Sequence, residues 1–240
     1  MNEITKQAKL SAEQVEAFYH DEFVNDQVRD FCELVGDTGN ELVVDMGGGC
    51  GFFAHQLSAT AGYPTRVVDM DPTSIDKCRD LGVNARLGDA LAPEILGDED
   101  VVCFNLILHH LVGATERETR SLQSKALRAW HRTGVRVFVN EYIYQSVVGR
   151  VSPRLIYEIT SSRLLSAVGQ QVGRLIPSFR ANTFNVGVRF RSHEQWLEMF
   201  AEAGYRVSAK RIGESEFISL PRRLLLIRTI RRDSFLLESI

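Results

Sequence analysis

The hydrophobic residues of this chain fall into short apolar runs that are separated by longer amphipathic stretches. The runs are rich in Val, Ile, Leu and Phe, and several of them end directly at a glycine or an acidic residue. Continuous apolar runs of this length are typical of parallel strands that are buried on both faces. We therefore expect strands at residues 41–45, 65–69, 83–87, 100–105 and 136–140, and two late strands at 205–210 and 223–229.

The stretches between these runs have the spacing of helices. Helices are expected at residues 11–35, after Gly51, and within 146–190, where Pro177 ends a long one. Three further helix starts carry recognisable caps, namely Asp71 before Pro72, Thr115 with Glu118, and Ser192 with Gln195.

The alternation of strands and helices from residue 41 to 140 predicts a doubly wound α/β sheet. With the two late strands, we expect a mostly parallel seven-stranded sheet, preceded by an N-terminal helix and interrupted after strand five by a helical insertion. A length of 240 residues fits one domain. In this domain we expect 1–36 to form a helical lid and 146–190 to face the substrate.

Composition adds the cellular setting. Hydrophobic residues make up 44% and charged residues 25% of the chain, which is ordinary for a soluble protein. The four cysteines lie far apart without a CxxC pair, which favours a reducing compartment over disulfides or a structural zinc. The first residues are too polar for a signal peptide, and no apolar stretch is long enough to cross a bilayer. We expect a cytoplasmic protein that does not enter membranes.

The charge is unevenly distributed along the chain. Residues 1–146 hold 13 Lys and Arg against 23 Asp and Glu, whereas residues 147–240 hold 15 against 8. Seven arginines lie between residues 147 and 191. They form either a solvated face that docks on the acidic half or a lobe that accepts an anionic substrate. A nucleic-acid surface is disfavoured because no aromatic platform or binding motif accompanies them.

The candidate chemistry lies in the loop after the first strand. Asp45 ends that strand, and glycines follow at 47, 48, 49 and 51. A glycine turn between a strand and a helix lets backbone approach a ligand closely. The Gly-x-Gly-x-x-Gly pattern of dinucleotide sites is absent, and an acid here would repel a pyrophosphate. The loop therefore favours a cofactor that carries cationic groups.

On these residues the sequence resembles class I S-adenosylmethionine (SAM)-dependent methyltransferases, from about residue 42 to 142. The resemblance implies that Asp45 and the backbone of Gly47, Gly49 and Gly51 hold the methionyl part of SAM.

Three later features continue the resemblance. Asp69, at the end of the second strand, is expected to bind both ribose hydroxyls, and Asp71 is better suited to cap a helix. Asp89 and Ala90 match the adenine contact of the family. Asn105 opens the family's fourth-strand motif, which lines the methionyl and reaction side.

Two histidines follow Asn105 in this motif. His109 and His110 are adjacent and so point in different directions, which excludes the metal pair that a spacing of three or four allows. We expect no metal. Each of the two histidines is either a packed or capping residue or a catalytic base, and we place His109 in the candidate set.

The end of the fifth strand is the second candidate region, with Asn140, Tyr142 and Tyr144. Doubly wound folds bind ligands at this edge of the sheet. Asn140 is either a loop hydrogen-bonding residue or catalytic, and the tyrosines are either half-buried core or an aromatic wall beside the sulfonium, which aromatic faces attract. We place Asn140, Tyr142 and His109 in the candidate catalytic set.

The resemblance implies methyl transfer from SAM. No Asn-Pro-Pro-Tyr motif follows at Asn105, which points away from amide or base acceptors and toward a small molecule, an anionic one if the arginines bind it. We expect a monomer or homodimer with no nucleic-acid partner.

One alternative keeps the fold and changes the reaction. In it the α-amine of SAM attacks its own γ-carbon and yields azetidine-2-carboxylate and methylthioadenosine, as in the similar azetidine-2-carboxylate synthases. Asn140 with Tyr142 or Tyr144 would then hold the neutral amine. A non-enzymatic scaffold is disfavoured because the cofactor motifs are intact.

Overall fold

The computed structural model describes residues 21–36, 40–131, 133–147, 188–218, 223 and 226–240. The predicted helical segments at 11–20 and 148–187 lie outside the described residues, as do most of the expected lid and insertion.

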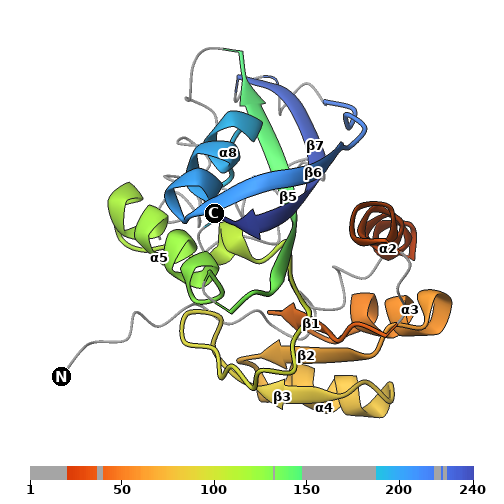
Figure 1. The fold of residues 1–240 in the computed structure, drawn as a ribbon. Coiled ribbons are helices and arrows are strands. Elements are labelled where there is room, and N and C mark those ends of the chain that lie inside the picture. The colour runs from red at the N-terminus through yellow and green to blue at the C-terminus, as the bar shows by residue number, and fades with distance from the viewer. Residues whose placement is uncertain (1–20, 37–39, 132, 148–187, 219–222, 224–225) are drawn as a thin grey trace.

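Seven strands form one sheet, as the sequence predicts (Figure 1). The strand order is β3-β2-β1-β4-β5-β7-β6. The first five strands are parallel, and β7 runs antiparallel to both β5 and β6. The strands are β1 (Val43–Met46), β2 (Thr65–Asp69), β3 (Ala85–Leu87), β4 (Val101–Asn105), β5 (Arg136–Ser146), β6 (Tyr205–Ile212) and β7 (Ile227–Ser239). The α/β fold with a mostly parallel seven-stranded sheet is confirmed.

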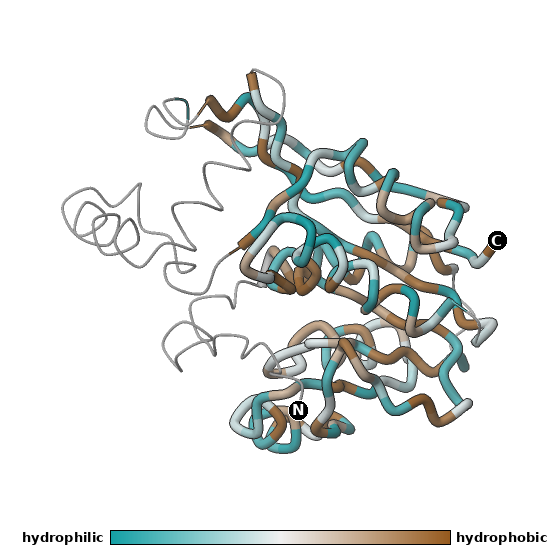
Figure 2. Tube along the Cα trace, turned by 90° about the vertical axis from the view of Figure 1, so that its left-hand side faces the viewer, coloured by the Kyte–Doolittle hydropathy of each residue, from teal (hydrophilic) through white to brown (hydrophobic). Residues whose placement is uncertain are grey.

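Helices cover both faces of the sheet. The core residues of α2 (Asp21–Val35), α3 (Phe52–Ala61) and α4 (Pro72–Asp80) pack on one face. Those of α5 (Glu116–Arg128) and α8 (His193–Glu202) pack on the other. Along the peripheral helices in Figure 2 hydrophobic and hydrophilic stretches alternate, as expected where one helix face is buried.

The predicted helix caps are present. The Asp71 carboxylate accepts from the backbone N–H of Ser74, and Ser192 with Gln195 forms a complete capping box. At α5 the Thr115 hydroxyl accepts from the N–H of Glu118 at 3.1 Å. The Glu118 carboxylate, however, accepts from Ala114 and not from Thr115, so the second half of that box is displaced by one residue.

The boundaries of two strands differ from the prediction. β5 continues six residues beyond Asn140, and the last strand spans Ile227–Ser239 instead of 223–229. The two strands pair along their whole shared length, which lets each include polar residues. The charged run in β7 is neutralised locally, because Arg231 binds Asp233 and Arg232 binds Asp26 of α2.

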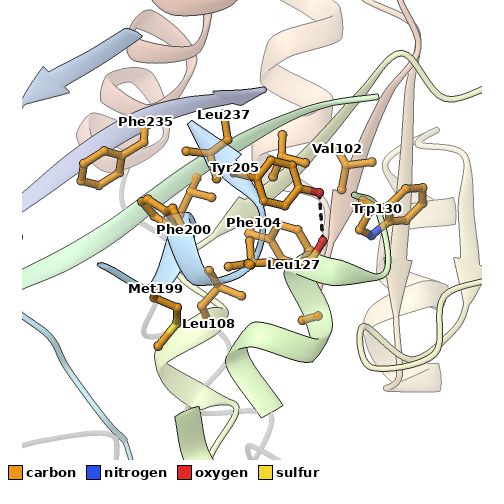
Figure 3. Close-up of a cluster of buried hydrophobic side chains, with 14 of the residues drawn as sticks. Val102, Phe104, Leu108, Leu127, Trp130, Met199, Phe200, Tyr205, Phe235 and Leu237 are labelled. Carbon is orange, nitrogen blue, oxygen red and sulfur yellow. Dashed lines mark hydrogen bonds between the residues drawn. The ribbon is translucent and has the colours of Figure 1, made fainter. Parts of the chain in front are cut away.

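The larger core cluster lies between the sheet and helices α5 and α8. Trp130, Phe200 and Tyr205 converge there on the strand residues (Figure 3). The buried Tyr205 hydroxyl donates to the backbone carbonyl of Leu127 at 3.0 Å and so joins the start of β6 to the last turn of α5. None of the helices in the described ranges combines the length and apolar character that crossing a bilayer demands.

Replacing Tyr205 by phenylalanine tests this connection. Tyr205→Phe should lower the free energy of unfolding by about 1 kcal/mol, because one buried hydrogen bond is lost while the ring still fills its place. Urea denaturation measures the change. Phe217→Ser, at a ring that is 82% exposed, is the control and should change stability little. Equal stabilities of Tyr205→Phe and the unmodified protein would contradict the assignment.

Candidate cofactor and acceptor site

The glycine loop makes the turn between β1 and α3. Gly47, Gly49 and Gly51 have φ values of +69°, +54° and +78°, which side-chain-bearing residues rarely adopt. Gly48 has another reason to be glycine, since a Cβ there would lie 2.4 Å from Oδ2 of Asp45. The turn therefore brings backbone directly against that carboxylate.

Asp45 is buried and only half satisfied. Its Oδ1 accepts from Nδ2 of Asn105 at 3.0 Å, while Oδ2 and the amide Oδ1 of Asn105 are buried with no hydrogen-bond partner. Burial raises the pKa of Asp45 from 3.8 to about 7; the hydrogen bond from Asn105 opposes the rise and the charge of Asp69 adds to it. Two unpaired buried acceptors side by side suit a ligand with a cationic donor.

Asp69 ends the neighbouring strand and faces the same loop. One oxygen accepts from the N–H of Gly49 at 3.0 Å and the other from that of Asp71 at 2.8 Å. Burial raises the pKa of Asp69, against the opposing effect of these two backbone hydrogen bonds. Each oxygen keeps a second lone pair for a hydroxyl donor. Asp71, its rival for that role, has its carboxylate engaged as the cap of α4.

Asp89 and Ala90 follow β3 on the far side of Asp69. The Asp89 carboxylate accepts from the N–H of Leu91 at 2.8 Å, and Gly88 donates to the carbonyl of Asp69 at 2.9 Å. The predicted cofactor residues thus come together at the carboxyl ends of β1, β2, β3 and β4. Their contacts with a cofactor stay predictions.

His109 lies in a short 3-10 helix, η1 (Leu108–His110), and pairs with a residue that the sequence reasoning missed. Its Nδ1 is 2.7 Å from Oε2 of Glu141, and its backbone N–H donates to Oε1 at 3.3 Å. Glu141 is fully buried in β5. Burial lowers the pKa of the adjacent His110 well below 6.5, and His109 adds to this effect.

Asn140 stands in the middle of β5 and not at its end, so the predicted end of this strand is wrong. It pairs in register with Asn105, level with the end of β4. Its amide donates to the hydroxyl of Ser234 at 2.8 Å and accepts from Gln27 of α2 at 3.3 Å. Ser234 in turn donates to Asp30 of α2. These contacts join α2 to the sheet, and a catalytic role for Asn140 stays a prediction.

Tyr142 and Tyr144 belong to an aromatic cluster at the extension of β5. Phe190 stacks on Tyr144 with ring centroids 4.2 Å apart, and lies 4.9 Å from His109. Tyr142 lies 5.9 Å from Phe190, 6.1 Å from His109 and 6.5 Å from Phe23 of α2. The predicted aromatic wall is present as a set of rings, and Phe190 is an additional member of it.

Two of the seven arginines are within the described residues. Arg189 and Arg191 both bind the carboxylate of Glu116, at 2.6 and 2.8 Å, and Arg191 also donates to Gln123. These two arginines therefore hold the 188–191 segment against α5. Within the described ranges no group of three or more His, Cys, Asp and Glu side chains is arranged to hold a metal ion.

Neither family models nor curated proteins match this chain. Solved structures do match. The protein bound to the Haloferax volcanii Trm112 methyltransferase activator has a TM-score of 0.60 and 14% identity, over 95% of this chain and 93% of that one. The MccD protein has a TM-score of 0.56 and 12% identity, over 92% and 97%.

A third match is an O-methyltransferase from neocarzinostatin biosynthesis, in complex with SAM and 2-hydroxy-5-methyl naphthoic acid. Its TM-score is 0.53 and its identity 16%, over 94% of this chain and 54% of that one, so this chain spans about half its length. At these identities the three matches show a shared fold.

The raised pKa of Asp45 predicts how stability depends on pH. The folded protein keeps this proton up to about pH 7, whereas the unfolded chain releases it near pH 3.8. Asp45 therefore reduces stability as pH rises from about 4 to 7. In ligand-free protein, Asp45→Asn should remove that loss and be more stable than the unmodified protein at pH 8, by on the order of 2–4 kcal/mol.

Denaturation of both proteins at pH 5 and pH 8 measures the difference. The exposed Asp76→Asn is the control and should leave the pH dependence as it is. If Asp45→Asn changes stability equally at both pH values, Asp45 is not a buried titrating carboxylate.

Proposed function

We propose that this chain binds SAM and transfers its methyl group to a small molecule. The observation that carries the proposal is the buried Asp45 carboxylate, whose Oδ2 lacks a partner at the glycine turn. SAM presents an ammonium group on its methionyl end, and this charge matches an unpaired carboxylate in a buried setting. Phosphate-bearing cofactors do not match it, because a second negative charge would be placed beside Asp45 and Asp69.

The remaining residues fit the rest of the cofactor in order along the sheet edge. Asp69 would accept from the ribose hydroxyls, and Asp89 with Ala90 would contact the adenine. Asn105 would contact the methionyl part through its unpaired Oδ1. The bound SAM of the neocarzinostatin O-methyltransferase, which shares the fold, supports this assignment.

When bound, SAM supplies a methyl group activated by a sulfonium. The chain must then position an acceptor beside it and exclude water. The rings of Tyr142, Tyr144 and Phe190 offer apolar faces for a flat acceptor, and aromatic faces also attract a sulfonium. An anionic charge on the acceptor is a further proposal. Arg189 and Arg191 are engaged by Glu116, but Nη1 of Arg189 and Nη2 of Arg191 are buried with no hydrogen-bond partner among the described residues.

Intramolecular cyclisation of SAM is the competing reaction. This reaction needs no base for a second substrate, and it needs Asn140 with Tyr142 or Tyr144 to hold the neutral amine. Asn140 is instead engaged by Ser234 and Gln27, and His109 with Glu141 supplies a basic group. Both observations favour methyl transfer.

Incubation of the pure protein with SAM alone separates the two reactions. We expect no methylthioadenosine, and S-adenosylhomocysteine only after an acceptor is added, with both nucleosides measured by liquid chromatography. Methylthioadenosine formed without an acceptor would overturn the methyltransferase proposal.

The ribose contact is tested by substituting the two neighbouring acids. Asp69→Ala should weaken SAM binding by on the order of 1–3 kcal/mol, or roughly tenfold to a hundredfold, because the ribose hydroxyls lose their acceptor. Calorimetric titration measures the affinity. Asp71→Ala is the matched control: it removes the cap of α4, lowers stability by about 1 kcal/mol and should leave affinity nearly unchanged. The reverse ranking would assign the ribose to Asp71.

A further inference from the structure

We propose that Glu141 is a positioning residue that holds His109 as the proton acceptor for a hydroxyl-bearing aromatic acceptor, that is, a phenol or a related enol. This inference rests on the proposed methyl transfer and names the acceptor class and the base for it.

Glu141 holds His109 at two points. One carboxylate oxygen accepts from the backbone N–H of His109 and the other contacts the ring Nδ1, at 3.3 and 2.7 Å. Both side chains are buried, with 0% of the surface of Glu141 and 5% of that of His109 exposed. A hold on both backbone and ring fixes where the imidazole lies and how it is rotated.

The contact also selects the tautomer. An ionised carboxylate only accepts hydrogen bonds, so Nδ1 of His109 carries the proton and Nε2 has the free lone pair. Among the described residues none makes a hydrogen bond to Nε2. An imidazole that a carboxylate orients through one nitrogen, and whose other nitrogen keeps its lone pair, is the arrangement that general bases use.

The fold places this base at the ligand-binding edge. β4 ends at Asn105, and Leu106 then adopts a φ of +56°, with its N–H bound to the carbonyl of Asn140. This turn directs η1 alongside the part of β5 that extends past β4. His109 therefore lies four residues from Asn105, beside Glu141 and Tyr142, where cofactor and acceptor sides would meet.

The aromatic wall indicates the shape of the acceptor. Phe190, which lies between His109 and Tyr144, is held by its two neighbours in the chain. The backbone N–H of Arg189 donates to the backbone carbonyl of His109 at 2.9 Å, and the backbone carbonyl of Arg191 accepts from the N–H of Tyr144 at 3.0 Å. Both arginines are anchored on Glu116. Rings fixed in this way favour a flat, unsaturated acceptor.

In the part of the chain that the structure describes, the titratable and charged groups around His109 and Glu141 come from η1, β7 and α5. On η1, His110 is adjacent, with its ring 4.2 Å from that of His109. Across the sheet, Asp233 of β7 is opposite Glu141 in register and is itself paired with His193 of α8 and with Arg231. On the side of α5, the charges are those of Glu116 with its two arginines. Glu141 is thus the carboxylate in contact with His109.

The step balances without any additional reagent. The acceptor O–H proton passes to Nε2 of His109, and an oxygen lone pair forms the new O–CH3 bond. The C–S bond breaks with its electron pair going to sulfur, which leaves S-adenosylhomocysteine. His109 then releases its proton to solvent.

The first test needs no acceptor. In protein labelled with 15N-histidine, NMR should show His109 as the Nδ1–H tautomer at neutral pH, with the signal assigned by its loss in His109→Gln. In Glu141→Gln this preference for the Nδ1–H tautomer should weaken, because a side-chain amide can donate as well as accept a hydrogen bond. Glu99→Gln, at a buried acid beyond the opposite end of β4, is the matched control.

The second test measures methyl transfer to phenol, catechol, salicylate and 4-nitrocatechol. Glu141→Gln should lower kcat about tenfold or more with little change in KM. The loss should be smallest for 4-nitrocatechol, which is already ionised and needs no base, whereas a merely structural defect would affect all acceptors alike.

The outcomes separate the two proposals. If the protein does not bind SAM or S-adenosylhomocysteine, the proposed function fails, and this inference fails with it even if the NMR result stands. If it binds the cofactor but methylates none of the four compounds, the acceptor class is overturned. An Nε2–H tautomer, or equal losses for every acceptor, would overturn the positioning role of Glu141.

Discussion

The buried carboxylate of Asp45 sets the conditions that the rest of the site must meet. A carboxylate in this position loses its hydration, and Asn105 restores only one of its hydrogen bonds. The nearby glycines follow from the same constraint, because Gly48 leaves no room for a Cβ beside Oδ2. An unpaired carboxylate oxygen at this turn favours a ligand with a positive charge over one with a phosphate, and the proposed cofactor contact rests on this difference.

The sheet divides the site into two parts with different origins. The parallel strands β1, β2, β3 and β4 end at the same edge of the sheet. At or just after their carboxyl ends lie Asp45, Asp69, Asp89 and Asn105. The antiparallel pair β5 and β7 continues past that edge and supplies Glu141, Tyr142 and Tyr144. The proposed cofactor residues thus lie at strand ends, and the proposed acceptor residues lie along a strand.

This difference explains how far sequence reasoning could reach. Residues such as Asp45, Asp69 and Asp71 are placed by a strand and the turn directly after it, so spacing along the chain was sufficient to find them. Glu141 contacts a residue 32 positions earlier, and only the register of β4 with β5 brings the two together. The sequence does carry one signal. Glu141 directly follows the predicted strand, and the residues two positions before and after it, 139 and 143, are apolar. If the strand continues, this pattern indicates a buried carboxylate that needs a partner.

The same reasoning accounts for the misplaced end of β5. Residues 141–146 and 230–234 are too polar to be read as strands one at a time, and each becomes a strand because it pairs with the other strand. The charges of β7 are compensated by groups close in space, with Arg232 reaching Asp26 of α2. Asn140, which the sequence predicts at a strand end, lies within the longer β5, and its buried side chain contacts Gln27 of α2.

A single short segment links the two parts. Asn105 contacts Asp45, Ile107 packs so closely on Gly47 that an added Cβ there would lie 2.5 Å away, and His109 pairs with Glu141. Over five residues the first two contacts are made to β1 and the glycine loop and the third to β5, and the left-handed Leu106 makes the turn after Asn105. Any shift of the glycine loop on binding a cofactor would therefore act directly on the segment that carries His109. The glycine loop and His109 are thus linked by covalent connection and close packing within one short segment.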